Sequence, residues 1–175
     1  MNFLFIIFLV LITGAVVFFT AFYVLKMFLD NESKKRSLEY NNQNLKLITP
    51  VRLQAYERII LFLERISPNS LILRLQVPGM QSLQLQMEML SLIRAEFEHN
   101  LSQQIYMSDN AWQVANSAKE NVIKLINISA ESVEKDAPAM ELSKKIMELW
   151  VSTNPSPVKT AIVFIKNEIS TLFYN

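Results

Sequence analysis

The chain has 175 residues, no cysteine, one histidine, two glycines and a formal net charge of +1. The lack of cysteine excludes disulfides, a cysteine nucleophile and a lipid-modified N-terminal cysteine. Two widely separated glycines exclude the glycine-rich loops that cradle phosphates, and they also argue against an all-β fold, which needs many tight turns.

The first feature along the chain is an uncharged, proline-free apolar run from Phe3 to Leu25. As a helix of about 23 residues it reaches ~34 Å, enough to cross a hydrocarbon core of ~30 Å. The run is longer than the apolar core of a signal peptide, no basic residue precedes it and no small-residue cleavage triplet follows it. We therefore predict an uncleaved transmembrane anchor over residues 1–29 and a single-pass membrane protein.

Basic residues flank this run on one side only: Lys26, Lys34, Lys35 and Arg36. The positive-inside rule then predicts that the N-terminus lies outside and that everything after the run lies in the cytoplasm. The same cations attract anionic headgroups, by ~1 kcal/mol each near the surface. Because Asp30 and Glu32 weaken that attraction, we interpret the cluster as an orientation signal and keep lipid-surface sensing as an alternative.

A polar stretch over residues 30–48 separates the anchor from the rest and is predicted to be a linker, either helix or coil. The remaining residues, 49–175, are enough for one domain with its own core. Within it, two kinds of signal predict where helices begin, namely a capping side chain or a proline at the first turn. They stand at Thr49-Pro50, Ser82, Ser108, Pro138 and Ser156-Pro157.

Breaks between the helices are predicted at Ser67-Pro68-Asn69, at Val77-Pro78-Gly79, over residues 130–138 and over residues 152–155. A short helix is predicted over residues 71–75, and the longest is predicted to run from Ser82 to near Tyr106.

Apolar residues recur with helical spacing in every predicted segment. On the first helix of the domain the predicted buried face is Tyr56, Ile59, Ile60, Leu63 and Ile66, widened by Leu61 and Phe62. On the longest helix it is Leu83, Leu90, Ile93, Phe97, Leu101 and Ile105. The predicted fold is all-α: one N-terminal transmembrane helix and a compact cytoplasmic bundle of about five helices.

The only histidine, His99, follows Glu96 in an E-x-x-H arrangement, whose two side chains share one helix face. Di-iron bundles use such pairs, but they need two of them and two further glutamates, so we predict no metal ligand, no cofactor and no catalytic residue here. An enzyme or metal protein centred on Glu96 and His99 stays open as the weakest alternative.

Polar residues gather on that side of the same helix: Glu96, His99, Asn100, Gln103 and Gln104. If buried, they must satisfy one another, as a structural network or as a groove for a partner. We expect them to be exposed, because polar runs on helices usually face water.

Two other sequence features indicate binding surfaces only weakly. Residues 53–175 hold 11 Lys and Arg against 13 Asp and Glu, and no basic helix face emerges, so we predict no nucleic-acid binding. The methionines Met80, Met87 and Met89 are typical of core filling, with an adaptable binding groove as the alternative.

Four segments carry a resemblance to a family: the N-terminal apolar run, residues 53–75, residues 93–114 and residues 142–150. Together they resemble an uncharacterised family of small membrane-anchored helical proteins of Bacteroidota. The resemblance implies a bacterial inner-membrane location and no assigned activity. With the missing enzyme motifs, it favours a non-enzymatic interaction or adaptor module that binds the bilayer and a protein partner or a second copy of itself.

Overall fold

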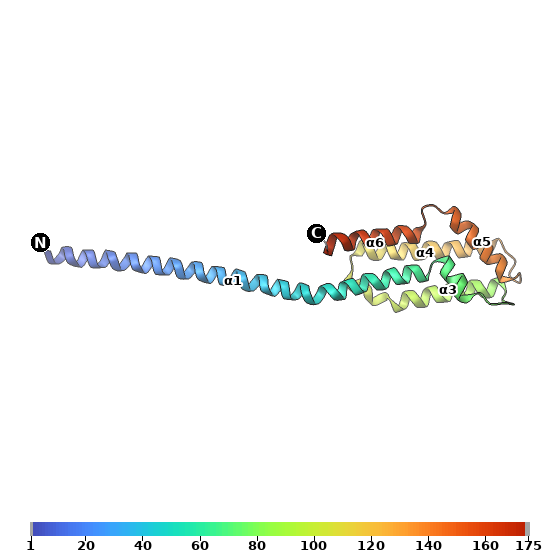
Figure 1. Ribbon diagram of the computed structural model, residues 1–175, viewed down its shortest axis with the longest axis horizontal. Coiled ribbons are helices and arrows are strands. Elements are labelled where there is room, and N and C mark those ends of the chain that lie inside the picture. The colour runs from blue at the N-terminus through green and yellow to red at the C-terminus, as the bar shows by residue number, and fades with distance from the viewer. Residues whose placement is uncertain (1, 174–175) are drawn as a thin grey trace. The chain divides into compact units, whose positions relative to one another are not determined.

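The structure of the protein is a computed structural model that describes residues 2–173. All regular elements in this range are helical, which confirms the all-α fold class. The elements are α1 (Asn2–Arg65), α2 (Pro68–Leu75), α3 (Ser82–His99), the 3₁₀-helix η1 (Leu101–Tyr106), α4 (Asp109–Glu131), α5 (Ala139–Ser152) and α6 (Pro157–Phe173) (Figure 1). The chain divides into two compact units, Met1–Thr49 and Pro50–Asn175. The finer division into an anchor over 1–29 and a linker over 30–48 stays a prediction.

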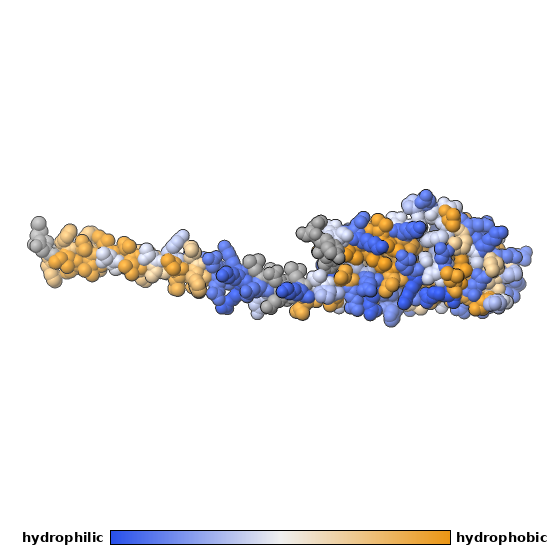
Figure 2. Space-filling model, in the orientation of Figure 1, coloured by the Kyte–Doolittle hydropathy of each residue, from blue (hydrophilic) through white to orange (hydrophobic). Residues whose placement is uncertain are grey.

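The first unit contains the N-terminal part of α1. Its stretch Phe5–Arg36 has 32 residues and contains an 18-residue window with a mean hydropathy of 2.8, none of which is buried, so it is long and apolar enough to cross a membrane. Figure 2 shows the helix as mostly hydrophobic up to about Leu29 and hydrophilic in the charged residues that follow. The backbone of residues 30–48, which the sequence left open as helix or coil, is helical.

Two hydroxyls inside the apolar stretch are satisfied within the helix itself. Thr13 Oγ1 donates to the carbonyl of Leu9 at 3.0 Å, and Thr20 Oγ1 donates to the carbonyl of Val16 at 2.9 Å. A polar group without a partner is costly in hydrocarbon, so these bonds make the stretch compatible with lipid.

The predicted helix start at Thr49-Pro50 is wrong, because α1 continues through Pro50. A proline inside a helix lacks the N–H that would bond the carbonyl four residues earlier, and its ring crowds that carbonyl. The sequence signal is ambiguous, because the same Thr/Ser-Pro pair begins a helix at Ser156-Pro157, where the residues before it are not helical. Here residues 15–49, directly before Pro50, contain no glycine or proline, and they stay helical.

The second unit is a bundle built around the C-terminal part of α1. Most of the predicted buried face of this helix is confirmed, and these side chains are fully buried: Tyr56, Ile59, Leu63 and Ile66. Phe62 is also buried, whereas Leu61 is 48% exposed. Helix α4 packs on α6 and α5, while α3 packs on α4 and α5 (Figure 1). The buried core described for this unit begins at Ala55 and ends at Ile165.

The longest predicted helix is divided in two. Helix α3 ends at His99, and the backbone of Asn100, with φ −104° and ψ 3°, leads into η1. The Asn100 side chain donates to the carbonyl of Glu96 at 2.7 Å and so caps the end of α3. A side-chain amide that bonds a nearby backbone carbonyl competes with continuation of the helix. This bond explains why the helix ends before η1.

The predicted buried face of this segment is partly wrong. Ile93 is buried as expected, but Leu83, Leu101 and Ile105 are 39%, 40% and 71% exposed. The face that is fully buried is Leu85, Met89 and Ile93. Apolar residues nearly alternate at the start of α3, so two helix faces are comparably apolar and the neighbouring helices select one.

Helix caps fall where predicted at α4 and α6. Ser108 Oγ accepts the Ala111 N–H at 3.0 Å, and Ser156 Oγ accepts the Lys159 N–H at 3.5 Å. Ser82 does not cap α3, because its hydroxyl donates to the Ala137 carbonyl at 3.1 Å in the loop between α4 and α5.

That loop is joined to the turn before α3 by backbone bonds as well. The Ser82 N–H donates to the Ala137 carbonyl at 2.8 Å, and the Ala139 N–H donates to the Met80 carbonyl at 2.9 Å, around a β-bridge between Gln81 and Pro138. The turn itself needs Gly79, whose φ of +82° is unfavourable for residues with a Cβ.

Candidate functional site

The five polar residues predicted as a surface cluster divide into two groups. His99 and Gln104 are exposed, as expected, and Gln103 is half-buried. The expectation is wrong for Asn100, which is 5% exposed, and for Glu96, whose side chain is 11% exposed. Whether the cluster binds anything stays a prediction.

Glu96 is held by two arginines from other helices. One carboxylate oxygen accepts from the Arg65 guanidinium of α1 at 3.2 Å, and the other accepts from the Arg74 guanidinium of α2 at 3.3 Å. A single carboxylate therefore joins α1, α2 and α3. The arginines are 55% and 41% exposed, so solvent screens both ion pairs.

These ion pairs bear on the hypothesis of an enzyme or metal site centred on Glu96 and His99. Both oxygens of Glu96 already accept from arginine cations, whose charge would repel a metal ion. Across residues 2–173, no three His, Asp or Glu side chains gather closely enough to hold a metal ion.

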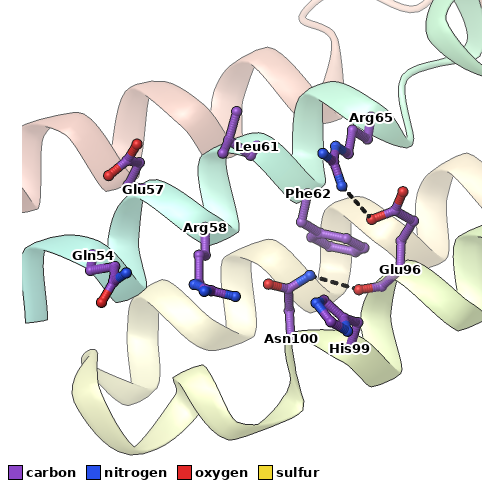
Figure 3. Close-up of a pocket in the computed structure, with 9 residues that line it drawn as sticks. All are labelled: Gln54, Glu57, Arg58, Leu61, Phe62, Arg65, Glu96, His99 and Asn100. Atoms are coloured by element: carbon purple, nitrogen blue, oxygen red, sulfur yellow. Dashed lines mark hydrogen bonds and ion pairs between the residues drawn. The ribbon is translucent and has the colours of Figure 1, made fainter. Parts of the chain in front are cut away.

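A polar pocket of about 330 Å³ lies where the C-terminal part of α1 meets the end of α3 (Figure 3). Its lining residues are Gln54, Glu57, Arg58, Leu61, Phe62, Arg65, Glu96, His99 and Asn100. Polar and charged side chains dominate the lining, and the buried Phe62 supplies an apolar wall. We call it the Arg58 pocket.

Three arginines on α1 define how the helix faces its neighbours along this pocket. Arg65 reaches Glu96 on α3, and the Arg52 side chain donates to the carbonyl of Tyr106 in η1 at 3.1 Å. From Arg52 to Arg65 along α1, the contacted residue moves back from Tyr106 to Glu96. Helix α1 is therefore antiparallel to α3 and η1. Arg58 lies between the two other arginines and faces the pocket.

An aromatic cluster lies behind the Arg58 pocket. The ring of Phe97 lies 5.8 Å from that of Phe62 and 5.4 Å from the ring of Trp112, with which it is stacked. The Lys119 ammonium lies 3.7 Å from the centroid of the Phe97 ring. Such pairs add about 0.5–1.5 kcal/mol beyond burial, so they stabilise the packing of this wall of the pocket.

A second polar network lies inside the bundle. The Tyr56 hydroxyl donates to one oxygen of Glu168, and Ser108 Oγ donates to the other at 2.7 Å. The Ser108 N–H also donates to the Tyr56 hydroxyl, at 3.3 Å. Burial, followed by the hydrogen bond to the Glu168 carboxylate, raises the pKa of Tyr56 above its ordinary value. The network ties α1 and α6 to the start of α4, so its position indicates a structural role.

The bundle also exposes apolar side chains around the turn between α2 and α3. Leu73, Val77 and Met140 are 86%, 56% and 65% exposed, and they line a shallow groove of about 540 Å³. Of the three methionines considered from the sequence, Met80 and Met89 are buried in the core as expected, whereas Met87 is 59% exposed.

The class of protein is defined by these features: an all-α protein with one N-terminal helix long and apolar enough to cross a membrane. The chain belongs to DUF7935, a family of unknown function, whose family model matches residues 2–172. No curated protein and no solved structure matches it. The match fits the resemblance to an uncharacterised family, and the expected Bacteroidota origin stays a prediction.

Proposed function

We propose that this chain is a single-pass protein of the bacterial inner membrane, with its N-terminus outside and a cytoplasmic bundle that binds a partner protein without catalysing a reaction. One observation carries the proposal. No residue of the apolar window within Phe5–Arg36 is buried, while the core of the bundle is built from Ala55 onward. The stretch is therefore free to enter a bilayer.

The exposed area supports the membrane part of this proposal. Large apolar side chains between Phe3 and Leu29 are 42–77% exposed. At about 25 cal/mol per Å² of apolar surface, leaving a helix of this kind in water is strongly unfavourable, and lipid removes the cost.

The charges after the stretch support the orientation. Lys34 and Lys35 are exposed, while Arg36 pairs with Glu32 at 3.0 Å. This pairing reduces the charge available to anionic headgroups, so the cations serve orientation better than lipid recognition. Lipid-surface sensing by Lys34 and Lys35 is the second candidate function.

Orientation can be tested with a single introduced cysteine, because the chain has none. We expect S132C, on an exposed position after α4, to resist a membrane-impermeant maleimide in intact cells and to react after lysis. Labelling in intact cells would place the bundle outside and refute the proposed orientation.

Partner binding is supported by the exposed apolar groove of Leu73, Val77 and Met140, since such surfaces are typically covered by other proteins. The test is co-purification from native membranes in mild detergent through a tag at the C-terminus, followed by mass spectrometry. The matched control keeps the bundle and replaces residues 1–29 by an unrelated transmembrane helix. A stoichiometric partner retained by both chains supports binding by the bundle. If neither chain brings one, the interaction part of the proposal is refuted.

A further inference from the structure

We infer that the Arg58 pocket binds a carboxylate of an acidic segment in the partner protein, with Arg58 as the main cation. This inference rests on the proposed function and names the chemistry of the partner. It starts from three arginines along α1: within residues 2–173, Arg52 and Arg65 each donate to an acceptor, whereas no hydrogen bond or ion pair joins Arg58 to one.

Arg58 and Arg65 are seven residues apart, so they lie near one side of α1, whereas Arg52, six residues before Arg58, is offset from it by about 120° around the helix. Arg52 donates to the carbonyl of Tyr106, and Arg65 donates to Glu96. Among residues 2–173, no carboxylate lies within ion-pair distance of the Arg58 guanidinium. At the position where an acceptor for Arg58 would lie, the structure has a pocket.

The residues opposite Arg58 explain why no carboxylate among residues 2–173 pairs with it. Because the helices are antiparallel, moving from Arg65 back to Arg58 moves the contact from Glu96 toward the end of α3. There the chain provides His99 and Asn100 instead of an acid. Asn100 donates its amide to the Glu96 carbonyl and does not neutralise the guanidinium.

Figure 3 shows how the charges are oriented. Arg58 extends toward Asn100 and His99, and the Glu57 carboxylate extends away from the Arg58 guanidinium, although Glu57 also lines the pocket. The pocket region near Arg58 therefore presents cationic and hydrogen-bonding groups to a ligand.

A contact next to Arg58 shows how a carboxylate is bound in this part of the bundle. Glu96 accepts from guanidinium groups of α1 and α2. A ligand carboxylate at Arg58 would form the same kind of charge-assisted pair. Glu57 opposes such a ligand, whereas repulsion from Glu96 is limited because two arginines neutralise it.

The volume and surroundings suit a short acidic segment. A pocket of about 330 Å³ falls at the small end of ligand sites, and it is open to solvent rather than sealed. Phe62, held by the ring of Phe97, provides a fixed wall for the carbon atoms of an acidic side chain. A free small dicarboxylate has the same chemistry and is the alternative source.

The experiment uses the full chain in lipid nanodiscs and a fluorescein-labelled hexaglutamate peptide as the probe, at an ionic strength of about 0.15 M. Binding is followed by fluorescence anisotropy. His99 is the only histidine, so ¹³C-histidine labelling gives one NMR signal from inside the pocket. We expect saturable binding that moves the His99 signal.

Variants assign the cation. R58Q should weaken binding of the peptide by about five-fold or more, as expected for a partly exposed charge-assisted pair. R94Q removes an arginine from an exposed position on α3 outside the pocket, so it is the matched control and should bind within about two-fold of the parent chain. R58K keeps the charge and should lie between them, because lysine lacks the two-pronged fork.

Three results would overturn the inference: no binding of either hexaglutamate or succinate, binding that R58Q leaves unchanged, or binding that leaves the His99 signal unmoved. Arg58-dependent binding of succinate as tight as that of hexaglutamate would support the carboxylate site and assign it to a small molecule. If a partner co-purifies equally well with the R58Q chain, the inference fails while the proposed function stands.

Discussion

Tyr56 offers the sharpest test of how the bundle is held together. Y56F keeps the buried ring and removes only the hydroxyl, which donates to Glu168 and accepts from the Ser108 N–H. Hydrogen bonds to charged groups contribute about 1.5–3 kcal/mol, and the second bond is long. Because Glu168 is half-buried and water can reach it, we expect a loss of about 1–2 kcal/mol in the free energy of unfolding.

The assay is urea unfolding of the full chain in detergent micelles, followed by tryptophan fluorescence. Both tryptophans, Trp112 and Trp150, lie in the bundle, so the signal reports its unfolding alone. With a slope of about 2 kcal/mol per molar urea, the midpoint should fall by roughly 0.5–1 M. Y106F is the control, because Tyr106 is 38% exposed, and it should change stability by less than about 0.5 kcal/mol.

The pH dependence gives the same variant a second readout. The pKa of Tyr56 is raised in the folded state, so above pH 10 the unfolded chain loses this proton while the folded chain keeps it. Stability of the parent chain then falls with rising pH, by at most about 1.4 kcal/mol per unit. Y56F lacks this contribution, so the difference between the two chains should shrink above pH 10 and stay constant below it. A difference that stays constant or grows above pH 10 would refute the assigned environment of Tyr56.

Three further outcomes can be measured in the same way. E96Q should lower the free energy of unfolding by about 1 kcal/mol because two ion pairs are lost, whereas E98Q, at an exposed position of α3, should be neutral. S108A removes the α4 cap and a bond to a carboxylate, so we expect a loss of about 1–2 kcal/mol; S117A, in the exposed middle of α4, should cost less than about 0.5. The fragment 50–175 should fold without detergent and unfold cooperatively, and a molten fragment would contradict the independence of its core.

Helix boundaries were predictable where a breaker acts locally. The turn at Gly79 and the caps at Ser108 and Ser156 follow from backbone geometry and short-range hydrogen bonds, which the sequence contains directly. Pro50 shows the limit, because one Thr-Pro pair is compatible with both a helix start and a helix interior. The buried face of α3 depended on which neighbours cover it, and near-alternating apolar residues from Leu83 onward do not specify that.

The candidate site was predictable only in part. Glu96 and His99 stood out by residue type, but Arg58 and Arg65, which give the pocket its positive charge, were missed. Its signal was available in the spacing of Arg58 and Arg65, which places both on one face of a helix. The contact between Tyr56 and Glu168 spans 112 residues, and no local pattern specifies a pairing of that length.

The bonds between the turn before α3 and the loop after α4 have a consequence for local opening. Ser82 and Ala139 donate their backbone N–H groups across the two connections, so neither connection can detach without breaking the bonds of the other. The two segments should therefore exchange their amide hydrogens together, at one common rate. Proteolytic cleavage at the exposed Lys135 should leave both halves of the bundle associated, since the cut ends stay held by the opposite connection.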